Sequence, residues 1–170
     1  MAVGRIIVAI IAVAALVVGI SVFRVNSAAA KATRYDDVKV LAYYRYGLHP
    51  SQIVYDVRDL GPAASQAEVL RGLFSFAEAL KDREFDQVVL AYRGEAKFLL
   101  DGGDFRTIGR EHAWQNPIYT LRTFPSLLTT PDGRPAFGSW NGGLLGVVGA
   151  QMDDVNELGR RWYLDDLLSR

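Results

Sequence analysis

An uninterrupted apolar segment near the start of the chain constrains this protein more than any other feature. Residues 6–23 read IIVAIIAVAALVVGISVF and contain no charged side chain, while Arg5 and Arg24 flank them. A helix of about 20 apolar residues is long enough to cross the hydrocarbon core of a bilayer. The segment therefore predicts a single transmembrane helix, in which residues 1–24 form a signal anchor and residues 6–23 hold the chain in the membrane.

Two other interpretations of this segment stay open. Ala28 and Ala30 have the Ala-x-Ala spacing of a signal-peptide cleavage site, so the segment could be a secretory signal that is removed. It could also be an apolar helix buried in the core of the domain. Because the apolar part of a signal peptide has only about 7–15 residues, we favour a retained anchor.

The charges around the segment bear on its orientation. Arg24, Lys31 and Arg34 come after it, and by the positive-inside rule they place the rest of the chain in the cytoplasm. The short N-terminal tail with Arg5 and the Ala-x-Ala spacing are instead typical of a segment that exports the remainder of the protein. We therefore expect a single-pass protein of the cell membrane with an extracytoplasmic C-terminal domain.

The remainder of the chain has the length of one domain. Residues 25–34 are rich in Ala, Ser, Asn, Lys and Thr and show no apolar period, which predicts a linker. Residues 35–170 then form one globular domain, since domains most often have about 100–150 residues.

Within residues 35–170, runs of β-branched and aromatic residues predict strands. These runs cover residues 38–46, 53–60, 85–92, 96–100 and 105–108. The last run comes after a tight-turn signal at Asp101-Gly102-Gly103-Asp104. With hairpins between them, these strands predict a mainly antiparallel sheet of about five strands.

Helix signals alternate with the strands. Ser65 and Glu68 have the spacing of a capping box, and apolar residues three and four apart continue from there to about Lys81. Asn116-Pro117 starts a short helix that Pro125 ends, and residues 144–168 form a third helix. The sequence therefore predicts an α+β fold in which about three helices pack on one face of the sheet.

The composition excludes several classes of function. The chain has Lys+Arg 19, Asp+Glu 19, a net charge of +0, Cys 0 and His 2. A domain without a basic excess is not expected to bind nucleic acid, because phosphate contacts dominate that affinity. The lack of cysteine excludes disulfides, thiolate metal sites and a cysteine nucleophile. We expect no cofactor and no bound metal.

Three charged residues are candidates for catalysis. Asp86 lies on the predicted strand 85–92, and Glu95-Ala96-Lys97 lies across a hairpin from it. If the two strands bring these side chains together, the two carboxylates could hold Mg²⁺ while the lysine orients water. This pattern resembles the core of the restriction-endonuclease-like nucleases, over about twenty residues, with Glu78 on a preceding helix; Phe85 stands where that family often has proline. The other interpretation is that Glu95 and Lys97 lie on the solvent side of a hairpin.

His112 is the fourth candidate catalytic residue. It stands among polar residues just before the Asn116 helix, and as a general base it would need Glu111 or another carboxylate to orient it. Adjacent residues rarely face one another, and a surface loop that caps the next helix explains the same residues.

Glycines and aromatic residues suggest where the domain makes contacts. Gly143, Gly146 and Gly149 recur every three residues and predict that the last helix packs closely on the sheet, with a ligand-approach site as the alternative. We expect Trp140 to seat the loop before this helix and to be a candidate binding residue.

Tyr43, Tyr44 and Tyr46 alternate along the first strand, so at least one of their rings points away from the core. Exposed tyrosines suit contacts with a partner, although strands also favour them for packing alone. We therefore expect a membrane-anchored binding or assembly module with a protein partner and no evident catalytic site. The alternatives are a metal-dependent hydrolase at Asp86, Glu95 and Lys97, or a small-ligand sensor.

Overall fold

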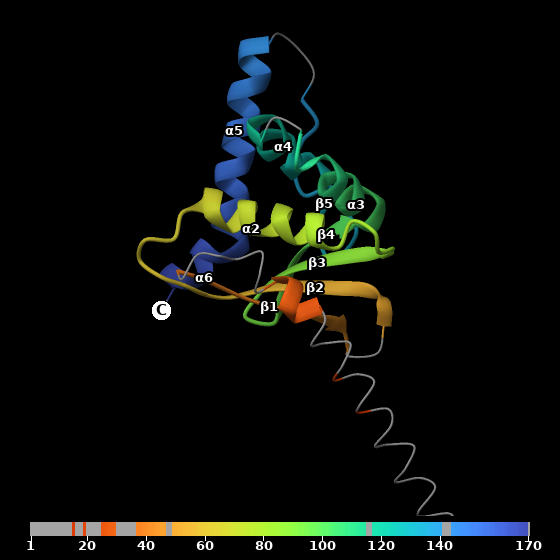
Figure 1. The fold of residues 1–170 in the computed structure, drawn as a ribbon. Coiled ribbons are helices and arrows are strands. Elements are labelled where there is room, and N and C mark those ends of the chain that lie inside the picture. The colour runs from red at the N-terminus through yellow and green to blue at the C-terminus, as the bar shows by residue number, and fades with distance from the viewer. Residues whose placement is uncertain are drawn as a thin grey trace, which may run out of the picture.

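The computed structural model describes residues 15, 19, 25–29, 37–46, 49–114, 117–140 and 144–169. Its helices and strands have the order β1 (Val38–Arg45), β2 (His49–Leu60), α2 (Gln66–Ala79), β3 (Gln87–Tyr92), β4 (Glu95–Asp101), α3 (Gly102–Glu111), α4 (Pro117–Thr123), η1 (Phe124–Leu127), β5 (Leu128–Thr129), α5 (Leu144–Gly159), η2 (Arg160–Leu164) and α6 (Asp165–Leu168). Together they form an α+β domain with a five-stranded sheet (Figure 1). The fold class and the number of strands agree with the sequence prediction.

The sheet is mixed: most of its strand pairs are antiparallel, as the sequence predicts, but one pair is parallel. The strands lie in chain order, and β1–β2, β3–β4 and β4–β5 are antiparallel pairs. β2 and β3 are parallel, because the 14-residue helix α2 lies between them and returns the chain to the same end of the sheet. A crossover of this kind is what adjacent parallel strands require.

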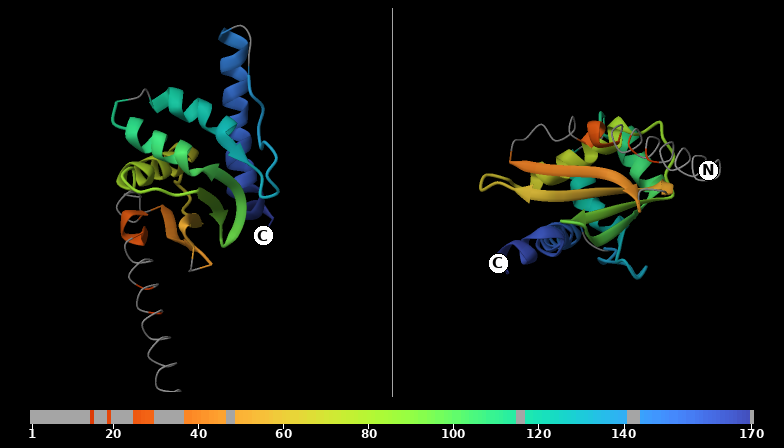
Figure 2. Two further views of the ribbon diagram at one scale, coloured as in Figure 1. Left: turned by 90° about the vertical axis from the view of Figure 1, so that its right-hand side faces the viewer. Right: turned by 90° about the horizontal axis from the view of Figure 1, so that it is seen from below.

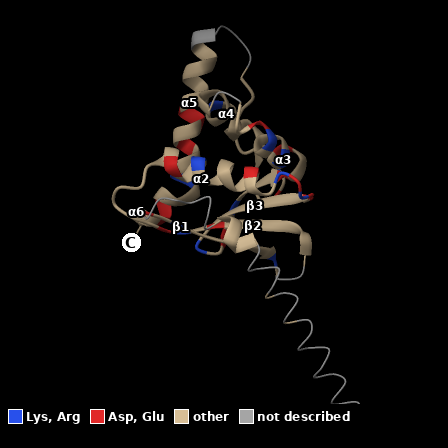
Figure 3. Ribbon diagram, viewed as in Figure 1, with Lys and Arg blue, Asp and Glu red and all other residues tan. Residues whose placement is uncertain are grey.

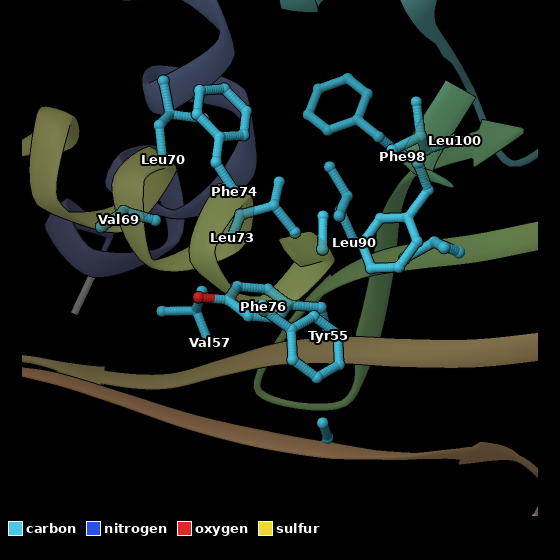
Figure 4. Close-up of a cluster of buried hydrophobic side chains, with 14 of the residues drawn as sticks. Tyr55, Val57, Val69, Leu70, Leu73, Phe74, Phe76, Leu90, Phe98 and Leu100 are labelled. Atoms are coloured by element: carbon cyan, nitrogen blue, oxygen red, sulfur yellow. The ribbon is translucent and has the colours of Figure 1, made fainter. Parts of the chain in front are cut away.

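One face of the sheet carries the main core. Tyr55 of β2, Leu90 of β3 and Phe98 of β4 point toward α2, where they meet Leu73 and Phe76 (Figure 4). Buried side chains of α3, α5 and η2 belong to the same cluster. A second, smaller cluster on the opposite face consists of strand residues alone. Among the described elements, the helices therefore cover only one face, as the sequence predicts.

Several local predictions are confirmed. The helix α2 begins after Ser65, and Ser65 and Glu68 form the capping box. Pro117 is the first residue of α4, and Pro125 lies in η1, which comes directly after α4. The predicted third helix is present as the continuous run of α5, η2 and α6. With α3, and apart from the helical residues 25–29, the described part of the chain has five α-helices rather than about three.

The segment predicted as a strand at 105–108 lies within α3. Asp101 caps this helix, because its carboxylate accepts hydrogen bonds from the backbone N–H groups of Gly103 and Asp104 at 2.7 and 3.3 Å. An Asx residue next to glycines suits a tight turn and a helix start equally well. Phe105 and Ile108 are three residues apart, and both reach the core from one side of the helix.

Gly146 and Gly149 of α5 do not mediate close packing. Gly146 and Gly149 are exposed, and a Cβ atom built on either would meet no atom within 4 Å in the described part of the chain. The close approaches instead involve α3, where a Cβ on Gly109 would lie 2.3 Å from the carbonyl oxygen of Ala77 in α2. The prediction that Gly146 and Gly149 pack this helix on the sheet is therefore wrong, and Gly143 lies outside the described residues.

The end of the N-terminal segment packs on the domain. Residues 25–29 are helical, with Val25 and Ala29 fully buried in the main core. Asn26 Oδ1 accepts a hydrogen bond at 3.3 Å from the backbone N–H of Ala42 in β1. This first part of the predicted linker thus covers the edge of the sheet next to β1 (Figure 1).

The predicted transmembrane helix at residues 6–23 lies outside the described residues, apart from Ala15 and Gly19. Both of these are helical and exposed. In the part of the chain that the structure describes, no helix is long and apolar enough to cross a bilayer.

We predict that this core is sensitive to alkaline pH. Burial raises the pKa of Tyr163 from its ordinary value of 10.0 to about 12, because the phenolate would lose its hydration. The folded state therefore keeps a proton that the unfolded state loses, and stability that is complete below about pH 10 should fall by about 2 kcal/mol as the pH rises to 12. Urea unfolding at several pH values across this range should show the loss of stability. Tyr163→Phe should remove the part of this loss that Tyr163 causes, because phenylalanine has no proton to lose. Tyr119→Phe, at a half-exposed ring, should leave the pH dependence unchanged.

Candidate functional site

An apolar pocket opens between α2, α4, α5 and the end of α3. Its volume is about 530 Å³, and its apolar walls are formed by Ala67, Phe74, Pro117, Ile118, Leu121 and Met152. This volume lies within the range of about 300–1,000 Å³ that is usual for ligand sites. The helix α4 contributes three of these side chains and has no buried residue of its own.

The polar part of the pocket lies where α2 meets the end of α3. Ser75 Oγ is 3.4 Å from Nε2 of His112, and Oε2 of Glu78 is 3.9 Å from the same nitrogen. A catalytic triad needs the serine and the carboxylate on different nitrogens of the ring. This arrangement therefore provides hydrogen-bonding groups for a bound molecule rather than an activated serine.

Exposed apolar side chains occur in the pocket wall and on the segments that form it. Trp114 is 70% exposed, Ile118 67%, Tyr119 50% and Met152 38%. Ile118 and Met152 line the pocket, while Tyr119 follows Ile118 in α4 and Trp114 comes two residues after the lining residue His112. Contiguous exposed apolar surface is typical of sites that bind a partner or ligand.

The structure does not bring Asp86 together with Glu95 and Lys97. The carbonyl oxygen of Asp86 accepts a hydrogen bond from Gly102, at the end of β3 where Gln87 pairs with Asp101. Glu95 pairs with Tyr92 at the other end of β3. Six residues of strand separate the two ends, which is about 20 Å.

Lys97 is held by two other contacts. Its Nζ lies 3.1 Å from Oε2 of Glu95 and 2.8 Å from Oδ2 of Asp166 in α6. Burial alone would lower the pKa of Lys97, but hydrogen bonds to Asp166 and Glu95 raise it above its ordinary value. The side chain therefore links β4 to the C-terminal helix as a cation. Glu78, the helical glutamate of the nuclease-like pattern, faces His112 instead.

The aromatic candidates lie away from this pocket. Tyr44 is buried, and its hydroxyl accepts a hydrogen bond from the guanidinium of Arg83. Tyr43 and Tyr46 line a separate hollow of about 320 Å³ beside β1 and β2. Trp140 is 44% exposed, and its indole N–H donates to the carboxylate of Asp154 in α5, so it ties the preceding loop to that helix.

Asp56, which no sequence pattern singles out, is a fully buried carboxylate on the outer face of the sheet. It accepts hydrogen bonds from Tyr43 Oη at 3.3 Å, from Arg58 Nη1 at 2.9 Å and from the backbone N–H of Gly94 at 3.1 Å. Burial and the nearby Asp56 carboxylate raise the pKa of the Tyr43 hydroxyl. Strand alternation in β2 suggests a solvent-facing aspartate here, so the sequence carried no signal of this network.

The described residues contain no group of three or more His, Asp or Glu side chains placed to hold a metal ion. Comparisons add no likeness on which to base a function: no protein family, curated protein or solved structure matches the chain. The arguments for function therefore depend on the sequence and the geometry of this domain.

Proposed function

We propose that this protein is a membrane-anchored binding module whose pocket between α2, α3, α4 and α5 takes an apolar segment of a partner protein. The observation that carries this proposal is that the pocket has exposed apolar walls at Ile118 and Met152, with the exposed Tyr119 and Trp114 close in the chain to its lining residues Ile118 and His112. Buried aromatic and aliphatic anchors usually supply most of the binding energy at such surfaces.

The apolar segment at residues 6–23 supports the anchor in this proposal, since it has the length of a single span. Ala15 and Gly19 are exposed, which favours an anchor over a helix buried in the domain core. The proposed topology places the domain on the extracytoplasmic side. A reporter fused to the C-terminus that is active in only one compartment tests this orientation, and a cytoplasmic signal would contradict it.

A small apolar ligand is the second candidate for the pocket. The volume of about 530 Å³ suits a compact molecule, and Ser75 and His112 would give it a polar end to bind. We favour the partner protein because the exposed apolar side chains extend outside the pocket, where a small ligand would not cover them.

Photo-crosslinking in the cells that produce the protein tests this proposal. With p-benzoylphenylalanine in place of Ile118, we expect one adduct of discrete mass; the same group at Thr107, exposed on α3, should give none. Adding Met152→Asp should reduce the Ile118 adduct at least about tenfold, because a charge would have to be buried against the partner. Asn156→Asp, at an exposed position of the same helix, serves as the matched control. Equal adducts at both crosslinking positions, or no effect of Met152→Asp, would contradict a partner site in this pocket.

A further inference from the structure

The outer face of β1 has an unusual composition for a surface strand. Every second side chain of β1 points to this face, and these residues are Lys39, Leu41, Tyr43 and Arg45. Leu41 is 37% exposed, and Tyr46, which comes directly after the strand, is 74% exposed. This row of outward-facing β1 side chains therefore contains basic, aromatic and aliphatic residues, and none of the four is acidic. No described helix lies over β1 and β2 when they are seen from below (Figure 2, right).

Arg45 is the cation of this row without a carboxylate partner. Acidic and basic residues are interspersed over the domain (Figure 3), and Lys39 forms an ion pair with Asp59 at 3.4 Å. Within the described ranges, no carboxylate lies within ion-pair distance of Arg45. Its guanidinium donates to the amide oxygens of Gln52 and Gln87 at 3.3 and 3.2 Å and lies over the ring of Tyr46. These contacts orient the group while leaving its charge uncompensated.

This surface is adjacent to the point where the chain enters the membrane in the proposed function. Val25 is fully buried in the core beside β1, and Asn26 bonds to the backbone of β1. The apolar segment ends at Phe23, so Arg24 alone separates it from the packed domain. One residue of chain spans at most about 3.6 Å in any conformation, and the headgroup layer on one side of a bilayer is about 5–8 Å thick. The β1 side of the domain is thereby held at the headgroup layer.

We propose that the outer face of β1, through Leu41, Arg45 and Tyr46, lies on the headgroups of anionic lipids in the membrane that holds residues 6–23. This inference rests on the proposed anchor. Arginine binds phosphate oxygens through its planar fork of N–H donors. Tyrosine suits the interface because its ring is apolar and its hydroxyl is polar. The membrane is favoured over a protein partner at this face because the anchor already places it within reach.

Site-specific labelling tests the contact, and the absence of cysteine from the chain makes single labels possible. Leu41→Cys, Tyr46→Cys and Gly149→Cys carry the same fluorophore in the full-length protein, reconstituted in phosphatidylcholine vesicles with phosphatidylglycerol. A lipid with a spin label on its headgroup quenches nearby fluorophores. We expect strong quenching at positions 41 and 46 and little at position 149, which is exposed on α5 and does not belong to this face.

The charge of Arg45 gives a second, independent measurement. Arg45→Gln should lower the ratio of docked to undocked domain, read from quenching at position 41, by about fivefold, as expected for one basic residue at an anionic surface. Replacing phosphatidylglycerol by phosphatidylcholine should also lower the ratio of docked to undocked domain, because the vesicle surface then has no anionic lipid. Arg134→Gln, on a side chain that is 79% exposed and outside this face, should leave the ratio unchanged.

An alkaline wash of the same vesicles separates failure of this inference from failure of the anchor. If the protein stays with the vesicles but the three labels are quenched equally, the inference is overturned while the anchor stands, and the face is left for a protein partner. If the wash removes the protein, residues 6–23 do not anchor it in the membrane. The proposed lipid contact, which depends on that anchor, is then overturned as well.

Discussion

Replacing Asp56 by alanine is expected to destabilise the domain by about 2–4 kcal/mol, because removing one partner leaves the others of a buried network unpaired. The carboxylate is fully buried and accepts three hydrogen bonds. Its loss would leave the N–H of Gly94 and the hydroxyl of Tyr43 without an acceptor. Arg58 is 46% exposed and can turn to water, which keeps the expected loss below the largest values for buried pairs. Urea unfolding monitored by circular dichroism measures the difference.

Asp59→Ala is the matched control for this prediction. Asp59 lies on the same strand and forms ion pairs with Lys39 and Arg93 at 3.4 and 3.7 Å, but its side chain is 53% exposed. Exposed pairs contribute about 0–1 kcal/mol, so this variant should unfold close to the wild type. Equal losses for the two variants would show that Asp56 is not held as the structure describes.

Replacing Gly109 by alanine is expected to cost about 3 kcal/mol or more, because the new methyl group would overlap backbone that cannot move aside. A Cβ atom here would lie 2.3 Å from the carbonyl oxygen of Ala77 and 2.6 Å from its carbonyl carbon. The helices α2 and α3 would have to separate, which would disturb the ring contact between Phe76 and Phe105. The thermal unfolding midpoint gives the readout.

Gly149→Ala is the counterpart in an exposed helix. A Cβ there meets nothing within 4 Å in the described part of the chain, so the higher helix propensity of alanine should stabilise the domain by about 0.5–1 kcal/mol. Both variants replace glycine by alanine, but Gly109→Ala is expected to lower the stability of the domain and Gly149→Ala to raise it. A destabilised Gly149→Ala variant would show that α5 has a close neighbour which the structure does not describe.

Much of the secondary structure could be predicted because its causes are local. The capping box of Ser65 and Glu68 satisfies backbone groups within one helical turn, and Pro117 suits a first helical position whatever surrounds it. The strands β1 to β4 coincide with runs of β-branched and aromatic residues that bury one face. Asp101 is the exception. It caps a helix because Phe105 and Ile108 pack into the core from a helix rather than from a strand, and the local sequence does not decide between the two.

Single residues of the candidate site could be predicted from the sequence, but not the groups that surround them. His112 stood out in the sequence, but the groups that face it, Ser75 and Glu78, lie on a helix more than thirty residues earlier. At least one ring of Tyr43, Tyr44 and Tyr46 was expected to point away from the core; Tyr44 is buried, whereas Tyr43 and Tyr46 share a hollow on the outer face. Asp86 and Glu95 belong to one hairpin, yet strand register places them at opposite ends of it.

The amino-acid sequence by itself determined the α+β class, the positions of most elements and the presence of an apolar segment long enough to be an anchor. These properties arise from periodicity, capping and length, which act within a few residues of chain. The tertiary structure decided the parallel pairing of β2 with β3, the burial of Asp56 and the pocket beside His112. Each of these joins residues far apart in the chain, and packing rather than local preference selects which of them meet.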